Sequence, residues 1–406
     1  MRIALATVGT TGDVTPFVAL AEGLLAAGHD VTAMSWELHR DAFEQAGIRF
    51  EAAGPATTEA DIGDTAARAA VAGSPMAQVA VLRDFHLRDA VAHYRTLRDL
   101  LPGHDLVLLH GIHALAEAAA RDGGLRYATA VFDPVLLPTV SAPPAGMPSL
   151  GPLNRLAWRM LDGMLRRLDG PLREALEAAD SPSARGVTMF RARSSRLHLV
   201  AVSPTIAPPP PDLEPATHFT GAWFRTRSPA PLPAELDAFL AAGDAPVVVT
   251  FGSMAAADHA AVLAVTGAGV RQAGRRMVLQ DRSGQAPVTD SVLRIGPVDH
   301  RALFPRAAAV VHHGGAGTSH AAVTARVPSI VLPHVGDQSF WADRLHRLGV
   351  APASLPVGKA NADGIAERVR LATSDRMRAA AFELGQRVAV ERGVARAIEQ
   401  LEQAAG

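Results

Sequence analysis

The chain has 406 residues, of which 48% are hydrophobic and 19% charged, with a net charge of −1 and an isoelectric point near 7. This length predicts two domains with sizeable cores, and the charge balance argues against nucleic acid or an anionic membrane as a partner. Cysteine is absent, which excludes disulfides and cysteine-based zinc sites and fits a reducing compartment.

The N-terminal sequence indicates neither export nor membrane insertion. The first apolar run, Ile3–Val8, is short and reaches the polar residues Thr10 and Thr11 at once, unlike a signal peptide. No apolar stretch approaches the roughly 18 residues that a membrane-spanning helix requires. We therefore expect a soluble, cytoplasmic protein without a membrane span.

Short apolar runs alternate with helical stretches over the first half of the chain. The strands that this pattern predicts are Ile3–Val8, Val31–Ser35, Ile48–Glu51, Asp105–His110 and Tyr127–Phe132. Strands that alternate with helices indicate βαβ units and a parallel sheet. The first helix is expected to have Thr15 as its N-cap and Pro16 as its first residue, and to stop at Gly28. The segment Met76–Leu101 is also predicted to be helical.

The middle of the chain is rich in proline. A loop over residues 134–152 is unusually apolar, since it contains Leu136, Leu137, Met147 and Leu150. Four consecutive prolines begin at Pro208 and others follow to Pro233, which excludes a helix or a central strand. Residues 208–234 are therefore predicted to form a semi-rigid connector.

A second alternating region follows the connector. Its predicted strands are Val247–Phe251, Met277–Gln280, Val292–Ile295, Ala309–His312 and Ser329–Pro333. A helical stretch from about residue 376 closes the chain. The sequence thus predicts two doubly wound α/β domains.

A glycine-rich turn in the second region indicates a phosphate site. His312-His313-Gly314-Gly315-Ala316-Gly317-Thr318 has the pattern of a strand that ends in histidines and turns into a helix. The first N–H groups of a helix lack partners and its dipole adds partial positive charge, so a phosphate fits there. One strand later, Asp337 and Gln338 begin the next helix, and a carboxylate beside an amide suits sugar hydroxyls. The pattern predicts a nucleotide-sugar site. A packing turn and a helix N-cap at Asp337 are the structural alternatives.

The first strand ends in the polar turn Gly9-Thr10-Thr11-Gly12-Asp13. This turn lacks the Gly-x-Gly-x-x-Gly spacing of dinucleotide-binding folds, and Val31–Ser35 does not end in an acid placed for a ribose. A nicotinamide-dependent dehydrogenase is therefore disfavoured.

These motifs together resemble the family 1 nucleotide-sugar glycosyltransferases. The donor signature of bacterial members matches at His312 to Thr318, Pro328, Pro333, Asp337-Gln338 and Leu348-Gly349. The Gly9 to Pro16 segment is similar to the first loop of sterol and antibiotic glycosyltransferases, and Gly336 to Trp341 is similar to the sugar motif of sterol glucosyltransferases. The resemblance covers nearly the whole chain. It implies the α/β GT-B architecture, in which two Rossmann-like doubly wound domains face each other across a cleft.

The resemblance also implies a domain plan. Residues 1–207 would form the N-terminal acceptor-binding domain, 208–234 the linker and 235–375 the C-terminal donor-binding domain. The helical segment 376–406 would return to the N-terminal domain, as the last helix does in the family.

The resemblance assigns most of the donor contacts. Diphosphate contacts would come from Ser253, His312, Gly315, Ala316, Gly317 and Thr318. Asp337 and Gln338 would hold the sugar hydroxyls, and the backbone at Val298 would read the pyrimidine. Many relatives carry a tryptophan after the strand that ends at Gln280, which stacks on the base. This chain has Arg282 nearby, which would stack on the base or reach a phosphate, and the difference leaves uracil versus thymine open. No Asp-x-Asp pair occurs, so no metal is expected, nor any cofactor besides the UDP- or dTDP-linked co-substrate.

Catalysis of transfer to a hydroxyl needs a base at that hydroxyl. The resemblance implies that Asp13 is this base, since it lies before a helix whose dipole favours the ionised carboxylate. Plant relatives have a histidine there and an aspartate elsewhere, so His113 would be the exchanged partner of Asp13. His110 is an alternative partner, and a helix-capping aspartate and packing histidines are the structural alternatives.

We therefore expect an inverting, metal-independent O-glycosyltransferase of antibiotic or other natural-product biosynthesis. It would move glucose or a related deoxysugar from a UDP- or dTDP-sugar to a hydroxyl of a hydrophobic acceptor such as a polyketide, macrolide, flavonoid or sterol-like alcohol. The apolar loop at 135–150 and the Met76–Leu101 segment lie where relatives bind such acceptors. A non-catalytic nucleotide-sugar-binding accessory protein, a C-glycosyltransferase and a sugar-nucleotide epimerase of the same fold are alternatives.

Overall fold

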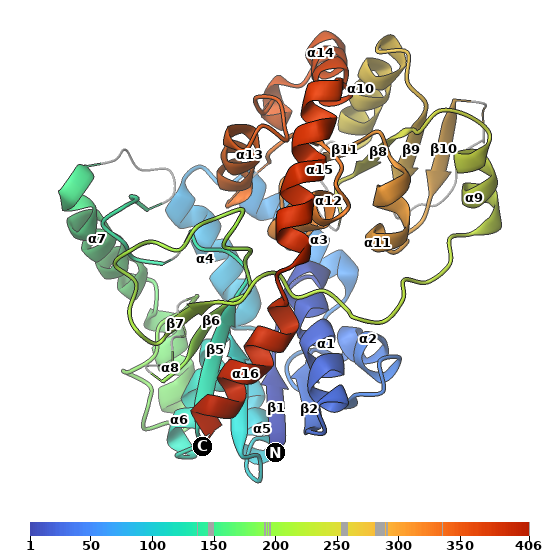
Figure 1. Ribbon diagram of the computed structural model, residues 1–406. Helices are drawn as coiled ribbons and strands as arrows, with labels where there is room; N and C mark the ends of the chain where they lie inside the picture. Colours follow the sequence, from blue (N-terminus) through green and yellow to red (C-terminus); the bar gives the residue numbers. More distant parts are fainter. Residues whose placement is uncertain are drawn as a thin grey trace. The chain divides into compact units, whose positions relative to one another are not determined.

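The computed structural model describes residues 1–406 except 136, 145–149, 191, 193, 195, 253–258, 281–288, 290, 335 and 406. The chain divides into two compact units, each built around a parallel β-sheet with apolar clusters on both faces (Figure 1). The first unit comprises Met1–Thr226 together with Arg392–Gly406, and the second comprises Arg227–Glu391.

The described sheet of the first unit has seven strands in the order β3-β2-β1-β4-β5-β6-β7, and all neighbours are parallel. The strands are β1 (Arg2–Ala6), β2 (Asp30–Ser35), β3 (Arg49–Ala52), β4 (Leu106–His110), β5 (Tyr127–Val131), β6 (His198–Val200) and β7 (Thr217–Phe219). The α-helices are α1 (Thr11–Ala26), α2 (Arg40–Glu44), α3 (Glu59–Ala70), α4 (Pro75–His86), α5 (Ala90–Leu100), α6 (Ala114–Asp122), α7 (Asn154–Arg167), α8 (Gly170–Ala178) and α16 (Gly393–Ala405). Short 3-10 helices are η1 (Glu37–His39) and η2 (Gly151–Leu153).

The last two strands of this sheet were not predicted. β7 lies inside the segment 208–234 that was expected to be a connector, so that expectation is wrong over Thr217–Phe219. The strand contains no proline and stands at the edge of the sheet, next to β6. The prolines around it therefore interrupt no hydrogen-bonded ladder.

The first helix begins five residues earlier than predicted. Thr10 is the N-cap of α1, because its hydroxyl accepts from the N–H of Gly12 and its own N–H donates to Asp13. Pro16 consequently lies inside the helix, where it removes one backbone hydrogen bond. The overlooked signal is the capping box Thr10-x-x-Asp13, which satisfies helix-start N–H groups more fully than a cap at Thr15 would.

The segment Met76–Leu101 forms two helices, α4 and α5, instead of one. The break falls at Asp89, which has a left-handed φ of 51°. A non-glycine residue in this conformation cannot continue an α-helix. The break sets α5 apart from α4, and each of the two helices carries a histidine, His86 and His93, that lines a pocket described below.

The described sheet of the second unit has five parallel strands in the order β10-β9-β8-β11-β12. They are β8 (Val247–Thr250), β9 (Met277–Gln280), β10 (Val292–Ile295), β11 (Ala309–His312) and β12 (Ser329–Val331). The helices are α9 (Ala234–Ala241), α10 (His259–Gln272), α11 (His300–Leu303), α12 (Ala316–Thr324), α13 (Gln338–Arg347), α14 (Ala362–Ala372) and α15 (Asp375–Ala389), with 3-10 helices η3 (Phe304–Arg306) and η4 (Val357–Lys359).

The two C-terminal helices belong to different units. α15 lies in the second unit and contacts α12, whereas α16 lies in the first unit and contacts α1 (Figure 1). Ala397 and Leu401 of α16 join the same apolar cluster as Phe17 and Leu24 of α1. The sequence places the start of the returning segment at about residue 376, and the structure assigns residues 392–406 to the first unit.

The sheet of the first unit is apolar on both faces. Ile3 and Leu5 of β1 pack on the face that α1 and α16 cover, while Ala4 and Ala6 pack on the face that α5, α6 and α8 cover. Alternate residues of a strand point to opposite faces, so a parallel strand covered on both sides is apolar throughout. Of the helices that the structure describes, none is both long enough and apolar enough to cross a membrane.

One buried carboxyl group in this core makes stability depend on pH. Glu117 of α6 is 3% exposed, and burial raises its pKa to about 7 although Arg121 and the Tyr127 hydroxyl oppose the shift. The folded state therefore holds this proton more tightly than the unfolded state, and stability falls as pH rises from about 4.5 through 7. The full effect is on the order of 3 kcal/mol.

We expect Glu117→Gln to gain thermal stability relative to the wild type as the pH rises from 5 to 8. Glutamine keeps the size and an oxygen acceptor but carries no charge to bury. Melting temperatures of both proteins across this range check the prediction. A difference between them that is independent of pH would refute it.

Candidate active site

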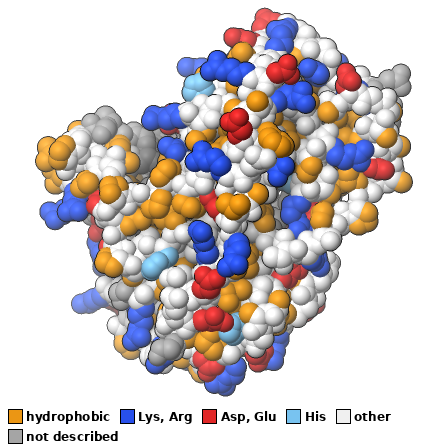
Figure 2. Space-filling view, in the orientation of Figure 1, with side chains coloured by type: hydrophobic (Ala, Val, Ile, Leu, Met, Phe, Trp, Pro, Cys, Tyr) orange, Lys and Arg blue, Asp and Glu red, His pale blue; other side chains and the backbone are white. Residues whose placement is uncertain are grey.

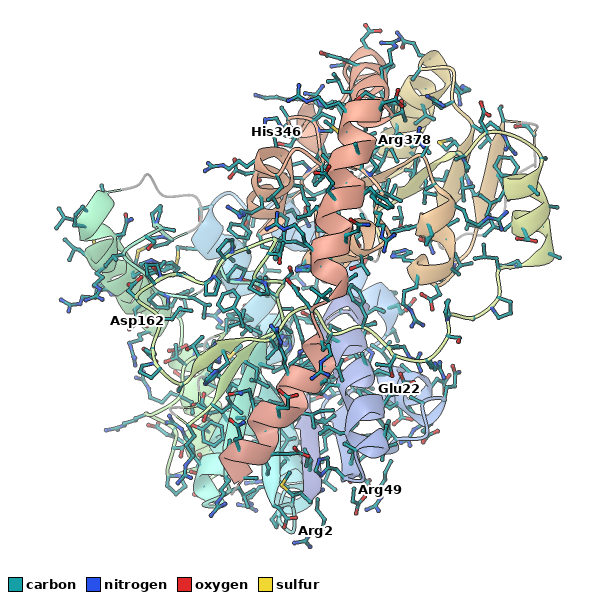
Figure 3. The ribbon with its side chains drawn as sticks, in the orientation of Figure 1. Arg2, Glu22, Arg49, Asp162, His346 and Arg378 are labelled. Atoms are coloured by element: carbon teal, nitrogen blue, oxygen red, sulfur yellow. The ribbon has the colours of Figure 1, made fainter. Side chains whose placement is uncertain are left out.

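Asp13 and His110 meet where two neighbouring strands of the first unit end. β1 and β4 are adjacent and parallel, with Ala6 opposite Leu109, so the residues that follow them share one edge of the sheet. Ligands of open α/β sheets bind at this carboxyl-terminal edge. At the opposite edge, Arg2, labelled in Figure 3, pairs with Asp105 at 2.9 Å.

The two oxygens of the Asp13 carboxylate have different partners. Oδ2 accepts from the N–H of Thr10 at 2.7 Å and from its hydroxyl at 2.8 Å. Oδ1 lies 3.9 Å from Nε2 of His110, and the side chain is 31% exposed. Asp13 therefore caps its helix with one oxygen and faces a histidine with the other, so the capping interpretation and a chemical role are compatible.

The turn that carries Asp13 needs a glycine at position 9. Gly9 has a φ of 116°, and a Cβ there would lie 2.5 Å from Oδ2 of Asp13. Two histidines hold the turn, since ring nitrogens of His39 and His110 lie 3.1 and 3.2 Å from the carbonyl oxygens of Gly9 and Val8. His39 was not anticipated, because it is distant in sequence and belongs to no motif.

The hydrogen bond from His110 to Val8 fixes the tautomer of the ring. A carbonyl oxygen only accepts, so Nδ1 carries the proton and Nε2 presents a lone pair toward Asp13. Burial lowers the pKa of His110, although Asp13 and the Val8 carbonyl oppose the shift, which favours the neutral ring. The rings of Phe17 and Phe132 pack against it at 5.8 and 5.1 Å.

His113, predicted as the partner of Asp13, lies in different surroundings. It is 3% exposed, stands at the start of α6, and packs its ring 5.1 Å from that of His93. The structure therefore brings His110, the alternative, to Asp13. The signal was present in the sequence, because His110 ends the predicted strand and His113 lies three residues beyond it.

His113 lines a small pocket beside the Asp13 turn, which has room for on the order of one water molecule in this structure. Its lining residues are Val8, His86, Leu87, His93, Ile112, His113, Ala114, Leu115 and Met189. Burial lowers the pKa of His86 and His93 to about 4 and that of His113 well below its usual range, so all three rings are neutral at pH 7. Both ring nitrogens of His93, and Nε2 of His113, have no hydrogen-bond partner among the described residues.

The start of α12 in the second unit presents free backbone donors. Gly315 is the N-cap, and no described group accepts from the N–H groups of Ala316, Gly317 or Thr318. These are the groups that the sequence assigns to a diphosphate, and the structure gathers them at the end of β11. Ser253, the remaining predicted phosphate contact apart from His312, lies outside the described residues.

The adjacent histidines His312 and His313 differ in exposure. His312 ends β11 with 0% exposure, its Nδ1 accepts from the N–H of Gly314 at 3.1 Å, and burial lowers its pKa to about 3. His313 is half-buried in the turn, and its Nε2 would lie 2.5 Å from a Cβ on Gly315. The geometry thus places His313 beside Gly315, the N-cap of α12, while the predicted contact His312 stands at the end of β11, where its Nε2 has no hydrogen-bond partner among the described residues.

Asp337 and Gln338 stand at the start of α13. Asp337 occupies the N-cap position, but its side chain makes no capping hydrogen bond and instead accepts from the indole N–H of Trp341 at 2.8 Å. Gln338 is 5% exposed, and its Oε1 accepts from the N–H of His334 at 2.7 Å. The structure therefore does not support side-chain capping as the role of Asp337.

Two polar side chains that the sequence did not single out support the Val298 segment. Gln280, at the end of β9, donates from Nε2 to the carbonyl oxygen of Val298 at 3.3 Å. Its Oε1 lies 2.8 Å from Nε2 of His300, whose ring stacks on Phe304. Arg282, the other predicted contact to the base, lies outside the described residues. Among the described residues, no group of three or more histidine, aspartate or glutamate side chains is arranged to hold a metal ion.

Comparison with known proteins decides the family. The glycosyltransferase family 28 N-terminal domain matches residues 3–79, and the erythromycin biosynthesis protein CIII-like C-terminal domain matches residues 275–402. The O-mycaminosyltylonolide 6-deoxyallosyltransferase of Streptomyces fradiae is 32% identical, over 99% of this chain and 97% of that relative. The chain belongs to the natural-product glycosyltransferases. Its vancomycin aglycone glucosyltransferase relative from Amycolatopsis orientalis is also 32% identical, over 87% of this chain and 86% of the relative.

The fold of the glycosyltransferase agrees with this assignment. The crystal structure of the glycosyltransferase VinC in complex with dTDP has a TM-score of 0.67 at 20% identity, covering 100% of this chain and 99% of that one. The predicted family and the α/β GT-B fold with two Rossmann-like domains are confirmed, as is enzymatic glycosyl transfer of the antibiotic and natural-product type.

Proposed function

We propose that the glycosyltransferase moves a hexose, glucose or a related deoxysugar, from a UDP- or dTDP-sugar to a hydroxyl of a hydrophobic natural product with inversion. The observation that carries the proposal is the pairing of Asp13 with His110. A half-buried carboxylate oxygen faces the lone pair of a neutral imidazole, 3.9 Å away, at the ligand-binding edge of a parallel sheet.

The proton balance of the transfer follows from this pair. The acceptor oxygen attacks the anomeric carbon while the bond from that carbon to the diphosphate oxygen breaks. The hydroxyl proton passes to Oδ1 of Asp13, because Oδ2 is held by Thr10. The new carboxyl O–H then faces the lone pair on Nε2 of His110, 3.9 Å from Oδ1, and an approach of the two side chains by about 1 Å makes this contact a hydrogen bond. Asp13 is the general base in this scheme, and His110 stabilises its protonated form.

The donor contacts that we propose lie in the second unit. The diphosphate binds the N–H groups of Ala316, Gly317 and Thr318, with help from the helix dipole. His312 is proposed to contact the diphosphate through Nε2, which has no hydrogen-bond partner among the described residues, and His313 beside Gly315 is proposed as a second contact. Asp337 and Gln338 bind the sugar, Val298 and Arg282 the base, and Ser253 a phosphate oxygen. No metal and no further cofactor is part of the scheme.

The donor class is supported by the relatives. One transfers 6-deoxyallose and another glucose, while VinC was crystallised with dTDP. We therefore propose both UDP- and dTDP-linked hexoses as candidate donors.

The acceptor side is proposed to lie in the first unit. The pocket lined by His86, His93 and His113 adjoins the Asp13 turn through Val8. On the face drawn in Figure 2, hydrophobic side chains gather over α7. Leu153 of η2 and Leu156 and Met160 of α7 are more than half exposed. This helix follows the apolar loop that was assigned to acceptor binding, which supports a lipophilic acceptor.

Mass spectrometry tests the proposed function. The protein is incubated with UDP-glucose or dTDP-glucose, with EDTA present, over a panel of hydrophobic alcohols and phenols. A mass gain of one hexose, on a product that acid hydrolyses, supports metal-independent O-transfer. An acid-stable product would indicate C-transfer, and nucleotide binding without any product would indicate the accessory-protein alternative.

We expect His110→Ala to lower kcat by about 10-fold, which is less than the ~10²–10⁴-fold that a positioned base contributes. His113→Ala should instead raise KM for the acceptor with a smaller change in kcat, because His113 lines the pocket and packs its ring against that of His93. Steady-state kinetics of both variants check this split. The reverse pattern would reinstate His113 as the partner of Asp13.

A further inference from the structure

The buried tryptophan Trp341 reaches the carboxylate that is proposed to bind the donor sugar. Trp341 is 0% exposed, and its indole N–H donates to Oδ2 of Asp337 across 2.8 Å, one helical turn away. An aspartate at an N-cap ordinarily accepts from a backbone N–H two or three residues on. The side chain of Asp337 makes no such capping bond and accepts from the indole instead, so a side chain of the core orients its carboxylate.

A second side chain links Trp341 to the start of the phosphate-binding helix. His320 of α12 is 2% exposed, and its ring lies edge-on to Trp341 at 4.9 Å. Its Nδ1 lies 2.7 Å from the carbonyl oxygen of Ala316, the first residue of α12. That carbonyl only accepts, so Nδ1 is the donor. A continuous set of contacts thus runs from Ala316 through His320 and Trp341 to Asp337.

We propose that Trp341 is a positioning residue that sets how the enzyme reads the donor sugar. It holds the Asp337 carboxylate in one orientation, and through His320 it fixes that carboxylate relative to the N–H groups that bind the diphosphate. The inference rests on the proposed function, because it needs Asp337 to contact the sugar. Trp341 itself touches neither sugar nor phosphate in this scheme.

The physical reason is loss of rotational freedom before binding. A free aspartate side chain samples several rotamers. It loses conformational entropy when a sugar hydroxyl binds to one of them, and this loss weakens binding. The charge-assisted hydrogen bond to a buried indole removes that freedom in the unliganded protein. The sugar then binds a carboxylate that is already oriented. A sugar with the opposite configuration at that hydroxyl binds more weakly, because the carboxylate does not reorient to accept its hydrogen bond.

Trp341→Phe is the direct test, because phenylalanine keeps an aromatic side chain in the core and removes the N–H. Calorimetry measures Kd for dTDP and for dTDP-glucose, and for UDP and UDP-glucose. We expect the ratio of the nucleotide-sugar Kd to the diphosphate Kd to rise about 10-fold, while the Kd of the diphosphate itself stays nearly constant.

Trp223→Phe is the matched control. Trp223 is 3% exposed and donates from its indole to the Thr220 hydroxyl at 2.9 Å, in the first unit. The Trp223→Phe variant therefore loses a comparable buried hydrogen bond, and it should leave the ratio of the nucleotide-sugar Kd to the diphosphate Kd unchanged. Should Trp341→Phe fail to fold, 3-benzothienylalanine at position 341 replaces the N–H by sulfur at nearly constant shape.

The outcomes separate the two ideas. An unchanged ratio in a folded Trp341 variant would overturn the positioning role while leaving the proposed function intact. An equal change of the Kd ratio in Trp341→Phe and Trp223→Phe would show that the ratio follows general stability, and would also overturn the positioning role of Trp341. Failure of the wild type to bind either nucleotide sugar would remove the proposed function and the inference together.

Discussion

Asp13→Asn is expected to lower kcat by ~10²–10⁴-fold, the contribution typical of a positioned general base. Asparagine is nearly the same size, and its amide oxygen accepts the two hydrogen bonds from Thr10, so the start of α1 is preserved. What it lacks is a basic oxygen facing the acceptor hydroxyl. Rates of product formation at saturating donor and acceptor measure the loss, and the Kd of the nucleotide sugar should be unchanged.

The chain offers a matched control for this variant. Asp61 stands at the third position of α3 and accepts from the N–H and the hydroxyl of Thr58, both at 2.7 Å, in the same capping-box geometry as Asp13. Asp61→Asn should leave kcat within about twofold, because it changes only a cap and a 3.9 Å ion pair with Arg88 on a partly exposed surface. Equal losses in both variants would mean that Asp13 acts through the fold of its helix, and the proposed base would be rejected.

Gly315→Ala is expected to weaken nucleotide binding by ~10–100-fold, the value of one or two hydrogen bonds to a charged group. A Cβ at this position would lie 2.5 Å from Nε2 of His313, so the imidazole must leave the phosphate site. The backbone itself accepts alanine, since Gly315 has a φ of −64°. The melting temperature should therefore change little while Kd for dTDP or UDP rises.

A double-mutant cycle with His313→Ala shows whether the effect passes through this histidine. If it does, Gly315→Ala adds little to the loss already caused by His313→Ala, because the group it displaces is gone. Full additivity would show that the new methyl blocks the helix start directly. Unaltered Kd in both single variants would contradict the assignment of the diphosphate to α12.

The architecture was predictable because parallel strands covered on both faces are apolar and contiguous. Val247–Phe251 and Ala309–His312 are examples, and both are strands of the second sheet to within one residue. β7 escaped prediction because three residues in a proline-rich segment carry no period. The start of α1 was misplaced because proline is common at the first position of a helix, so Thr15-Pro16 fits the pattern of a helix start. The capping box at Thr10 and Asp13 determines the true start.

The candidate site was predictable at the level of motifs and less so at the level of contacts. The glycines after His312 and the Asp337-Gln338 pair were identified because a helix start and a polar pair are local features. The exact end of a strand decides which of two neighbouring histidines is buried, and which of His110 and His113 reaches Asp13. Sequence locates strand ends only to within a few residues. The Trp341 and His320 contacts join two helices and leave no local signal at all.

A crystal structure with dTDP or UDP bound would locate the donor site. We expect the diphosphate at the start of α12, within hydrogen-bond distance of the N–H groups of Ala316, Gly317 and Thr318 and beside His313, with the base against the Val298 segment. A nucleotide bound instead at the Gly9 turn after β1 would contradict the account, because that edge would then bind the donor and Asp13 would lose its place at the acceptor.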